Sequence, residues 1–253
     1  MAPQQLVGAL FPATSPYSEP AVAGLAQAIS RMEQIDAYAE THEPRGQHDG
    51  VACFSTLYHA VLCRVWEGIH LGSFRSPEFV SELTVVLANR YLSALRANVL
   101  AAPMVPDAWS ALFDRRADAH VTQVQFAAAG INAQVNFDLP IAIVDTCTRL
   151  ECSPCSAAVL SACHELTRIF AEEMQAVRTQ FQHRWERLID PSVLARVTAK
   201  INDWTVIADR AIAWEAALRL WELRAGRSNE VAFIDRLDTI AGGLSRGVLI
   251  PVL

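Results

Sequence analysis

The sequence has little charge, and charge of one sign gathers nowhere along it. Charged residues make up 19% of the 253 residues, and the formal net charge is -6. A protein that binds nucleic acid needs clustered Lys and Arg to displace counterions from phosphates, and no such cluster is present. We therefore expect no nucleic-acid partner.

Long hydrophobic runs are also missing. Although 52% of the residues are hydrophobic, amides or charges break each apolar stretch well before the roughly 20 residues that cross a bilayer. The first twenty residues carry no Lys or Arg ahead of their short apolar segment, unlike a secretory signal. These absences predict a cytoplasmic protein without a membrane span.

No linker divides the chain, and its length fits one large domain. Prolines at positions 3, 12, 16 and 20 predict an irregular N-terminal arm over residues 1–21. We expect residues 22–253 to form a single helical domain, and the sequence leaves a homodimer open. Apolar residues recur at helical spacing through most of this region, which predicts an all-α bundle of about eight to ten helices. The predicted helices cover residues 22–39, 50–70, 77–100, 106–115, 119–137, 138–150, 154–189, a short segment after Pro191, 204–224 and 228–240.

Complete motifs for metal or redox chemistry are lacking. Cys152 and Cys155 have the spacing of a CxxC motif, but no second pair accompanies them, and a lone CxxC is a weak signal. His164 and Glu165 begin an HExxH pattern, but Arg168 occupies its last position, which excludes the zinc-protease motif. We therefore expect neither a bound metal nor a cofactor.

The most informative stretch present is residues 119–137, which contains no Asp, Glu, Lys or Arg. Its Ala content favours a helix, and a helix without a charged face is usually buried on all sides. We predict that this helix is the centre of the bundle. Buried amides are costly unless they find partners, and the stretch carries five of them: Gln123, Gln125, Asn132, Gln134 and Asn136. Gln125, Asn132 and Asn136 are spaced to line one side.

Three charged residues in apolar surroundings are candidates for a site. Arg90 projects from the apolar stripe of the helix predicted over 77–100, where a guanidinium needs a carboxylate. Asp145 follows four apolar residues and is its candidate partner. Such a pair is either a structural ion pair or a clamp for an anion or a carbonyl. Asp138 is predicted to cap the helix that restarts before Pro140.

Five blocks of the sequence resemble an actinobacterial family of helical proteins classed as a domain of unknown function, over residues 45–253. The blocks are DGVACFSTLY (49–58), LANRYLSAL (87–95), QFAAAGINAQVNFDLPIAIV (125–144), DRAIAWEAALRLWELR (209–224) and FIDRLDTIAGGLSRGVLIP (233–251). In that family the position of Gln134 is commonly His, which forms a plausible metal-ligand pair with Asp138, and the position of Phe170 is commonly Asn. The resemblance therefore implies weaker metal binding here and a more apolar, amide-lined pocket, which suits a hydrophobic organic molecule.

The leading hypothesis is a metal-free enzyme that acts on a small, largely apolar metabolite by cyclisation, isomerisation or elimination, as in natural-product biosynthesis. Arg90, Asn132 and Asn136 would donate to a carbonyl or a developing oxyanion, and Asp138 or Asp145 would accept a proton. The predicted substrate-binding residues are His48, Tyr58, His59, Asn89, Tyr91, Gln125, Gln134 and Phe170.

Two alternatives stay open. One is a metal-dependent hydrolase like the helical phospholipases and nucleases, in which Asp138 acts with His48, Asp49, His59, His120 or His164. The other is a non-catalytic ligand-binding or interaction protein in which the amides only specify core packing. The second alternative predicts a filled centre.

Overall fold

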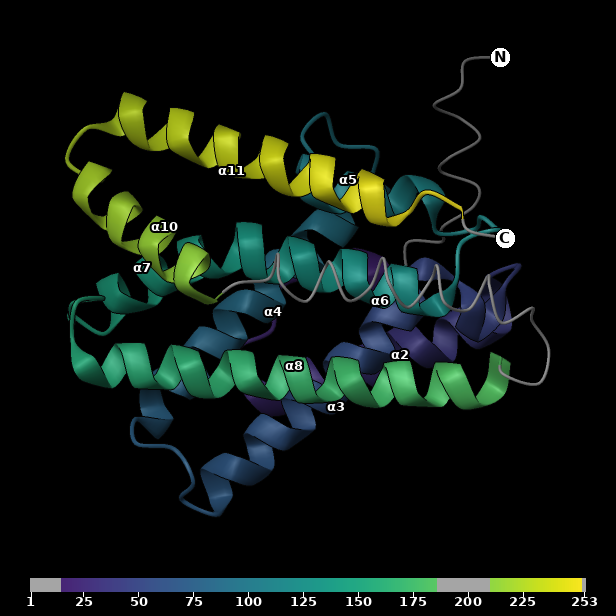
Figure 1. The fold of residues 1–253 in the computed structure, drawn as a ribbon, viewed down its shortest axis with the longest axis horizontal. Coiled ribbons are helices and arrows are strands. Elements are labelled where there is room, and N and C mark those ends of the chain that lie inside the picture. The colour runs from purple at the N-terminus through teal and green to yellow at the C-terminus, as the bar shows by residue number, and fades with distance from the viewer. Residues whose placement is uncertain (1–14, 186–209, 252–253) are drawn as a thin grey trace.

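The structure is a computed structural model that describes residues 15–185 and 210–251, and these residues form an all-helical bundle (Figure 1). The predicted fold class is thus confirmed. The described α-helices are α2 (Leu25–His42), α3 (Gly50–His70), α4 (Pro77–Val99), α5 (Asp107–Arg115), α6 (Gln123–Asn132), α7 (Leu139–Arg149), α8 (Ala157–Trp185), α10 (Arg210–Leu223) and α11 (Arg227–Val248). Shorter turns are the 3-10 helices η1 (Pro16–Ser18) and η2 (Gly46–His48) and the π-helix η3 (Ala133–Asp138).

The N-terminal arm is described from residue 15 onward. Ser15 caps η1 by accepting a hydrogen bond from the backbone of Tyr17, and the Tyr17 side chain is buried. Residues 1–14, the helix predicted after Pro191 and residues 204–209 lie outside the described part of the chain. No helix among the described residues is long and apolar enough to span a membrane.

The central helix is longer than expected and starts later. Thr122 and Gln125 form a capping box, so the helix begins at Gln123 rather than at residue 119. It does not restart at Asp138, because α6, η3 and α7 follow one another without a break to Arg149. Asp138 has helical backbone angles, φ -74° and ψ -40°, and caps nothing. A π turn is wider than an α turn, so it accommodates the ring and the missing N–H of Pro140.

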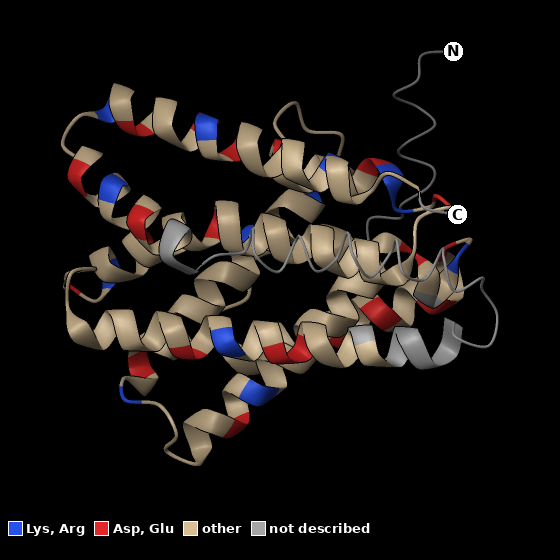
Figure 2. Ribbon diagram, in the orientation of Figure 1, with Lys and Arg blue, Asp and Glu red and all other residues tan. Residues whose placement is uncertain are grey.

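The first part of this continuous helix, α6, lies at the centre of the bundle, as predicted. Every residue of α6 from Val124 to Asn132 is buried, and Figure 2 shows charged residues on the outer helices while α6 carries none. Gly130 permits the close approach of α3: a Cβ added there would lie 2.1 Å from Cδ2 of Phe54. The small residue therefore makes room for an aromatic ring.

Helix α11 crosses α5 and the central helix with its C-terminal half. We expected it to end at Ile240, before Gly242 and Gly243, but it continues to Val248. The expectation was wrong because Gly242 serves close packing and does not end the helix: a Cβ there would lie 2.8 Å from the backbone carbonyl carbon of Asp107. One turn earlier, Asp238 accepts hydrogen bonds from the backbone N–H groups of Asp107 and Ala108, at 2.9 and 2.8 Å, and so caps α5 from another helix.

A buried ion network joins the N-terminal arm to three other segments. Asp49 caps α3 by accepting a hydrogen bond from the backbone N–H of Val51 at 2.8 Å. Nε of Arg116 donates to the second oxygen of Asp49 at 2.8 Å, and NH2 of Arg116 lies 2.7 Å from Glu43. The guanidinium also lies over the ring of Tyr17. One arginine thus connects the arm, the end of α2, the start of α3 and the segment after α5.

Candidate functional site

The centre of the candidate site is an ion pair between α4 and the central helix. Nε of Arg90 donates to Oδ1 of Asp138 at 2.8 Å, and Nε1 of Trp109 donates to Oδ2 of the same carboxylate at 2.8 Å. Arg90 therefore has a carboxylate partner, as its position in an apolar stripe required. The expected partner, Asp145, was wrong, because Asp138 lies inside the continuous helix with its side chain toward α4 and is not used as a cap.

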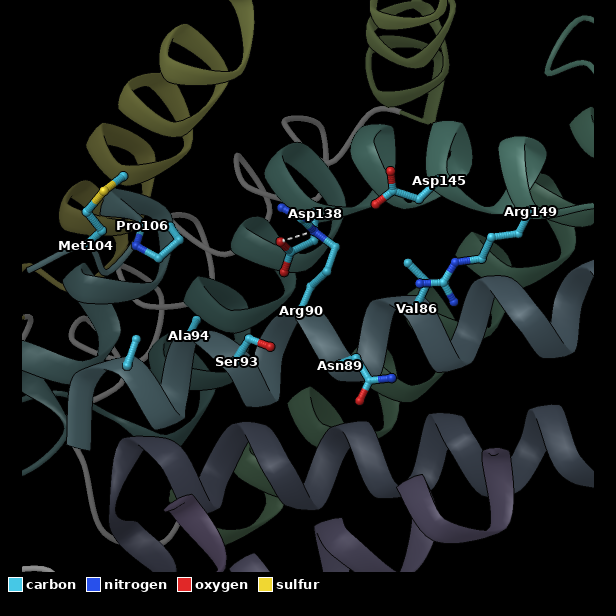
Figure 3. A pocket seen from close by; sticks show the side chains of 11 residues that line it. Val86, Asn89, Arg90, Ser93, Ala94, Met104, Pro106, Asp138, Asp145 and Arg149 are labelled. Atoms are coloured by element: carbon cyan, nitrogen blue, oxygen red, sulfur yellow. Dashed lines mark hydrogen bonds and ion pairs between the residues drawn. The ribbon is translucent and has the colours of Figure 1, made fainter. Parts of the chain in front are cut away.

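The ion pair borders a pocket of about 330 Å³ between α4, the second half of α7 and the loop that precedes α5 (Figure 3). Asp138 is almost fully buried, whereas 24% of the Arg90 side chain is exposed. In Figure 3 Arg90 rises from α4 to meet Asp138, and the carboxylate of Asp145 points toward the same space. The pocket is lined by Val86, Asn89, Arg90, Ser93, Ala94, Ala97, Met104, Pro106, Asp138, Asp145 and Arg149.

The two carboxylates of the pocket differ in their hydrogen bonding. Burial raises the pKa of Asp138, although Arg90 and the hydrogen bond from Trp109 oppose this effect. Burial also raises the pKa of Asp145, and Arg90 and Arg149 oppose it through space. Both oxygens of Asp138 are engaged, but Asp145 makes no hydrogen bond or ion pair within the described ranges. Asp145 is therefore the carboxyl that can exchange a proton with a ligand.

The guanidinium of Arg90 has N–H donors that Asp138 does not use. Its Nε is used by Asp138, while NH1 and NH2 have no hydrogen-bond partner among the described residues. The guanidinium carbon lies 5.5 Å from the centroid of the Phe137 ring, which also helps to hold the group in place. A guanidinium held in this way can present two N–H donors to a carbonyl or carboxylate oxygen.

The amide row on the central helix faces α11 and the chain end, not the pocket. Nδ2 of Asn132 donates to the Ala241 carbonyl and to Oγ of Ser245, both at 2.8 Å, and Nδ2 of Asn136 donates to Oδ1 of Asn132 at 2.8 Å. Nε2 of Gln125 donates to the carbonyls of Val248 and Ile250 at 2.7 and 2.8 Å. The spacing argument correctly placed these amides on one side, and there they hold the C-terminal region.

Four other predicted substrate-binding residues lie in the core behind the ion pair. The rings of Tyr58 and Phe170 stack with centroids 5.8 Å apart. The Tyr91 hydroxyl pairs with Oγ of Ser55 at 2.8 Å, and Nε2 of Gln134 donates to the Leu87 carbonyl at 3.3 Å. Burial raises the pKa of both tyrosines. All four side chains are buried and none lines the pocket.

Asn89 lines the pocket, but its amide is engaged elsewhere. Its Oδ1 accepts from the backbone N–H of Val22 at 2.7 Å, and its Nδ2 donates to the Val22 carbonyl at 2.9 Å. Both hydrogen bonds fasten the segment before α2 to α4. Asn89 therefore contributes a wall of the pocket and anchors the start of the domain.

The histidines considered as metal ligands lie on separate elements. His48 ends η2, His59 lies on α3 with Nε2 3.2 Å from Glu33, His120 precedes α6 and His164 lies on α8. Within residues 15–185 and 210–251, no group of three or more His, Cys, Asp or Glu side chains is arranged to hold a metal ion. The oxygens of Asp138 are bonded to Arg90 and Trp109.

Several residues of the site had not been singled out as functional from the sequence. Trp109 lies in the helix predicted over residues 106–115, where no site residue was expected, yet its indole N–H donates to Asp138. Met104 and Pro106 come from the loop that breaks the helical pattern, and Arg149 comes from the end of α7. These residues lie near Arg90 only because of tertiary packing, so no local sequence pattern predicts that they belong to the site.

Fold and site together define an all-helical protein with a buried arginine–aspartate pair at the edge of an open pocket. A family model described as a family of unknown function (DUF5995) matches residues 25–251, and the chain belongs to that family. The resemblance inferred from the five sequence blocks is thereby confirmed as likeness to a family of unknown function. No curated protein and no solved structure matches the chain.

Proposed function

We propose that the protein is a small-molecule enzyme and that the pocket beside Arg90 and Asp138 is its active site. The observation that carries the proposal is the arrangement of three groups. A buried carboxylate holds Arg90, the guanidinium keeps two nitrogens for a ligand, and Asp145 lies on the same side with a raised pKa. Perturbed carboxyls beside positioned donors in a pocket are typical of active sites.

The reaction that this geometry supports is proton transfer next to a carbonyl group. Arg90 would donate to the carbonyl oxygen and stabilise the negative charge that develops when a neighbouring C–H bond breaks. Asp145 would take that proton, since a raised pKa makes a carboxylate a stronger base. Isomerisation, elimination and cyclisation all proceed through such a step. Asp138 would act as a positioning residue for Arg90.

The substrate class follows from the rest of the lining. Val86, Ala94, Ala97, Met104 and Pro106 supply an apolar wall, which suits a largely apolar molecule with one carbonyl or carboxylate group.

Binding of simple carbonyl and carboxylate compounds tests the proposal. Octanoate, cinnamate and 2-octanone would be titrated into the purified protein, with octane-1,2-diol as a probe that lacks both groups, and binding measured by calorimetry. We expect Arg90→Met to weaken carboxylate binding by about 30- to 150-fold, as the loss of charge-assisted hydrogen bonds of about 2–3 kcal/mol implies.

Arg219→Met is the matched control, because Arg219 is an exposed arginine on α10 that pairs only with Glu222 among the described residues. It should bind like the wild type. Equal affinity of the wild type and the Arg90→Met variant for every probe would show that the pocket is not the site.

A second candidate is a ligand-binding protein without catalysis, and the amide row favours it. Asn132 and Gln125 donate to carbonyls of α11, and Asn136 donates to the side chain of Asn132. This is the packing role that the hypothesis assigns to the amides. Incubation of a bound probe with protein separates the two candidates. Conversion of the probe, followed by mass spectrometry and nuclear magnetic resonance, would establish an enzyme, and binding without conversion of any ligand would favour a carrier or sensor.

A further inference from the structure

Two cysteines, Cys147 and Cys152, are brought together where α7 ends. This pair shares Cys152 with the CxxC motif but does not include Cys155. The backbone N–H of Cys152 donates to the carbonyl of Cys147 at 2.9 Å, and Glu151 between them has a left-handed φ of +50°. This is a Schellman motif, in which the side chains of the two bonded positions lie against each other. Here both of those side chains are cysteines.

The thiols of Cys152, Cys163 and Cys155 lie near the Cys147 side chain. Burial raises the pKa of Cys147, and these neighbouring thiols raise it further. All four cysteines are in the thiol form. Cys147 is buried and Cys152 is half-buried, so a reagent from solvent reaches Cys152 before Cys147. The backbone hydrogen bond holds the pair together without any need for the helix to unwind.

We propose that this turn is a thiol-oxidation site, where Cys147 and Cys152 form a reversible disulfide when the protein meets a peroxide. The Cys152 thiol releases its proton, and the thiolate attacks one peroxide oxygen. The O–O bond breaks, the sulfenic acid forms, and the leaving hydroxide takes up the released proton as water. Cys147 then attacks the sulfur of Cys152, the S–O bond breaks, and the hydroxide leaves as water with the proton from Cys147. Two thiols are oxidised to one disulfide, and hydrogen peroxide is reduced to two waters.

The neighbouring cysteines are less suited to these roles. Cys163 is buried and lies on α8, outside the turn whose backbone hydrogen bond joins Cys152 to Cys147. Cys155 is exposed and can also meet peroxide, but the backbone bond of the Schellman motif ties Cys147 to Cys152. The site lies beside the pocket in sequence, since Arg149 belongs to the pocket lining. The disulfide would fasten the end of the helix that carries Asp145.

Trypsin offers a direct test, because it cleaves after Arg149, between the two cysteines. Cys147 then belongs to the peptide of residues 117–149, while Cys152, Cys155 and Cys163 all belong to the peptide of residues 150–168. The full-length protein would be treated with hydrogen peroxide, blocked with iodoacetamide, digested and analysed by mass spectrometry. We expect the two peptides to be cross-linked, and dithiothreitol to release them.

Variants identify the cysteine that forms the link. Cys155→Ser should form the cross-link to the same extent as the wild type, and Cys152→Ser, at a half-buried position, should lose it. Circular dichroism would verify that both variants are folded. A disulfide confined to the peptide of residues 150–168, a cross-link that survives in Cys152→Ser, or oxidation to sulfinic acid without any cross-link would each overturn the proposal.

Discussion

Two aspartates seven residues apart on the central helix show how surroundings decide the role of a carboxyl group. In Asp138 one carboxylate oxygen accepts a hydrogen bond from Arg90 and the other accepts one from Trp109, and the residue is buried. Asp145 is half-buried and has no such partner in the described part of the chain. A buried charge that lacks hydrogen bonds destabilises a fold, and residues of this kind are retained at functional sites.

Asp145→Asn should therefore stabilise the protein at neutral pH while it removes the proposed proton acceptor. Burial raises the pKa of Asp145 above its unfolded value of 3.8, so the folded protein holds that proton more tightly than the unfolded chain. The free energy of unfolding of the wild type then falls as the pH rises from 3.8 through the raised pKa. The variant should be more stable above this range by up to about 1 kcal/mol and equally stable below it.

Urea denaturation of both proteins across the acid and neutral range measures this difference. Subtracting the two curves removes the contributions of Asp138 and Asp238, whose pKa values are also raised. If the difference in free energy of unfolding between the two proteins were the same at every pH, the pKa of Asp145 would not be raised in the folded protein.

At the scale of elements, α11 does two things for α5. It caps the start of α5 with the carboxylate of Asp238, and it approaches the same turn closely at Gly242. Pro106, at the capping position of α5, provides no side-chain hydrogen bond of its own. The start of this short helix therefore depends on Asp238, which is 131 and 130 residues away in the sequence from the two donors.

Two adjacent glycines of α11 test this close packing. Gly242→Ala should lower the free energy of unfolding by about 1–3 kcal/mol, because its methyl group meets immobile backbone at Asp107. Gly243→Ala should raise it by about 0.5–1 kcal/mol, since alanine favours a helix and nothing lies within 4 Å of the added carbon. The outcome to look for in chemical denaturation is this opposite sign. Equal effects at the two positions would show that α11 does not pack closely on Asp107.

Helix positions could be read from the sequence where local signals dominate. The predicted ranges 77–100 and 50–70 correctly placed the beginnings of α4 and α3. The prediction failed where tertiary contacts override local preference. Pro140 was taken as a restart because nothing local announces a π turn, and Gly242 as an end because its neighbour, Asp107, is distant in sequence.

The residues of the site could be predicted from the sequence only where a local pattern identifies them. An arginine in an apolar stripe requires a carboxylate, and that argument singled out Arg90 and named Asp145 as its partner. It missed the actual partner, Asp138, because the choice depends on the direction in which η3 points that side chain. The amides were correctly assigned to one side of the helix, but whether that side faces a pocket or α11 depends on where the chain end packs.

For the whole molecule, the Arg116 network connects regions that are far apart in sequence. Tyr17, Glu43 and Asp49 all contact this one guanidinium, whose side chain is 10% exposed. Burial lowers the pKa of Arg116, but Asp49, Tyr17 and Glu43 outweigh it and raise the pKa above the ordinary arginine value, so Arg116 stays charged. Removing Asp49 leaves the buried guanidinium with only part of its compensating charge, which is costly.

Asp49→Ala should lower the free energy of unfolding by about 3–5 kcal/mol, since it removes the α3 cap as well as the partner of Arg116. Thermal and urea unfolding, followed by circular dichroism and tryptophan fluorescence, would measure it. Glu222→Ala is the control: its ion pair with Arg219 is exposed, so the change should stay within about 0.5 kcal/mol. Similar losses in both variants would refute a special role for the network.

The π turn has a geometric consequence for the whole central helix. A π turn holds about one residue more than an α turn, and each residue of an α-helix turns the chain by about 100°. The winding of η3 thus sets the rotation of α7 relative to α6. If η3 were wound as an ordinary α turn, Asp138 and Asp145 would swing around the axis together, away from Arg90. The amides on α6 would stay against α11. One helix can in this way serve as an anchor on one side and as the wall of a site on another.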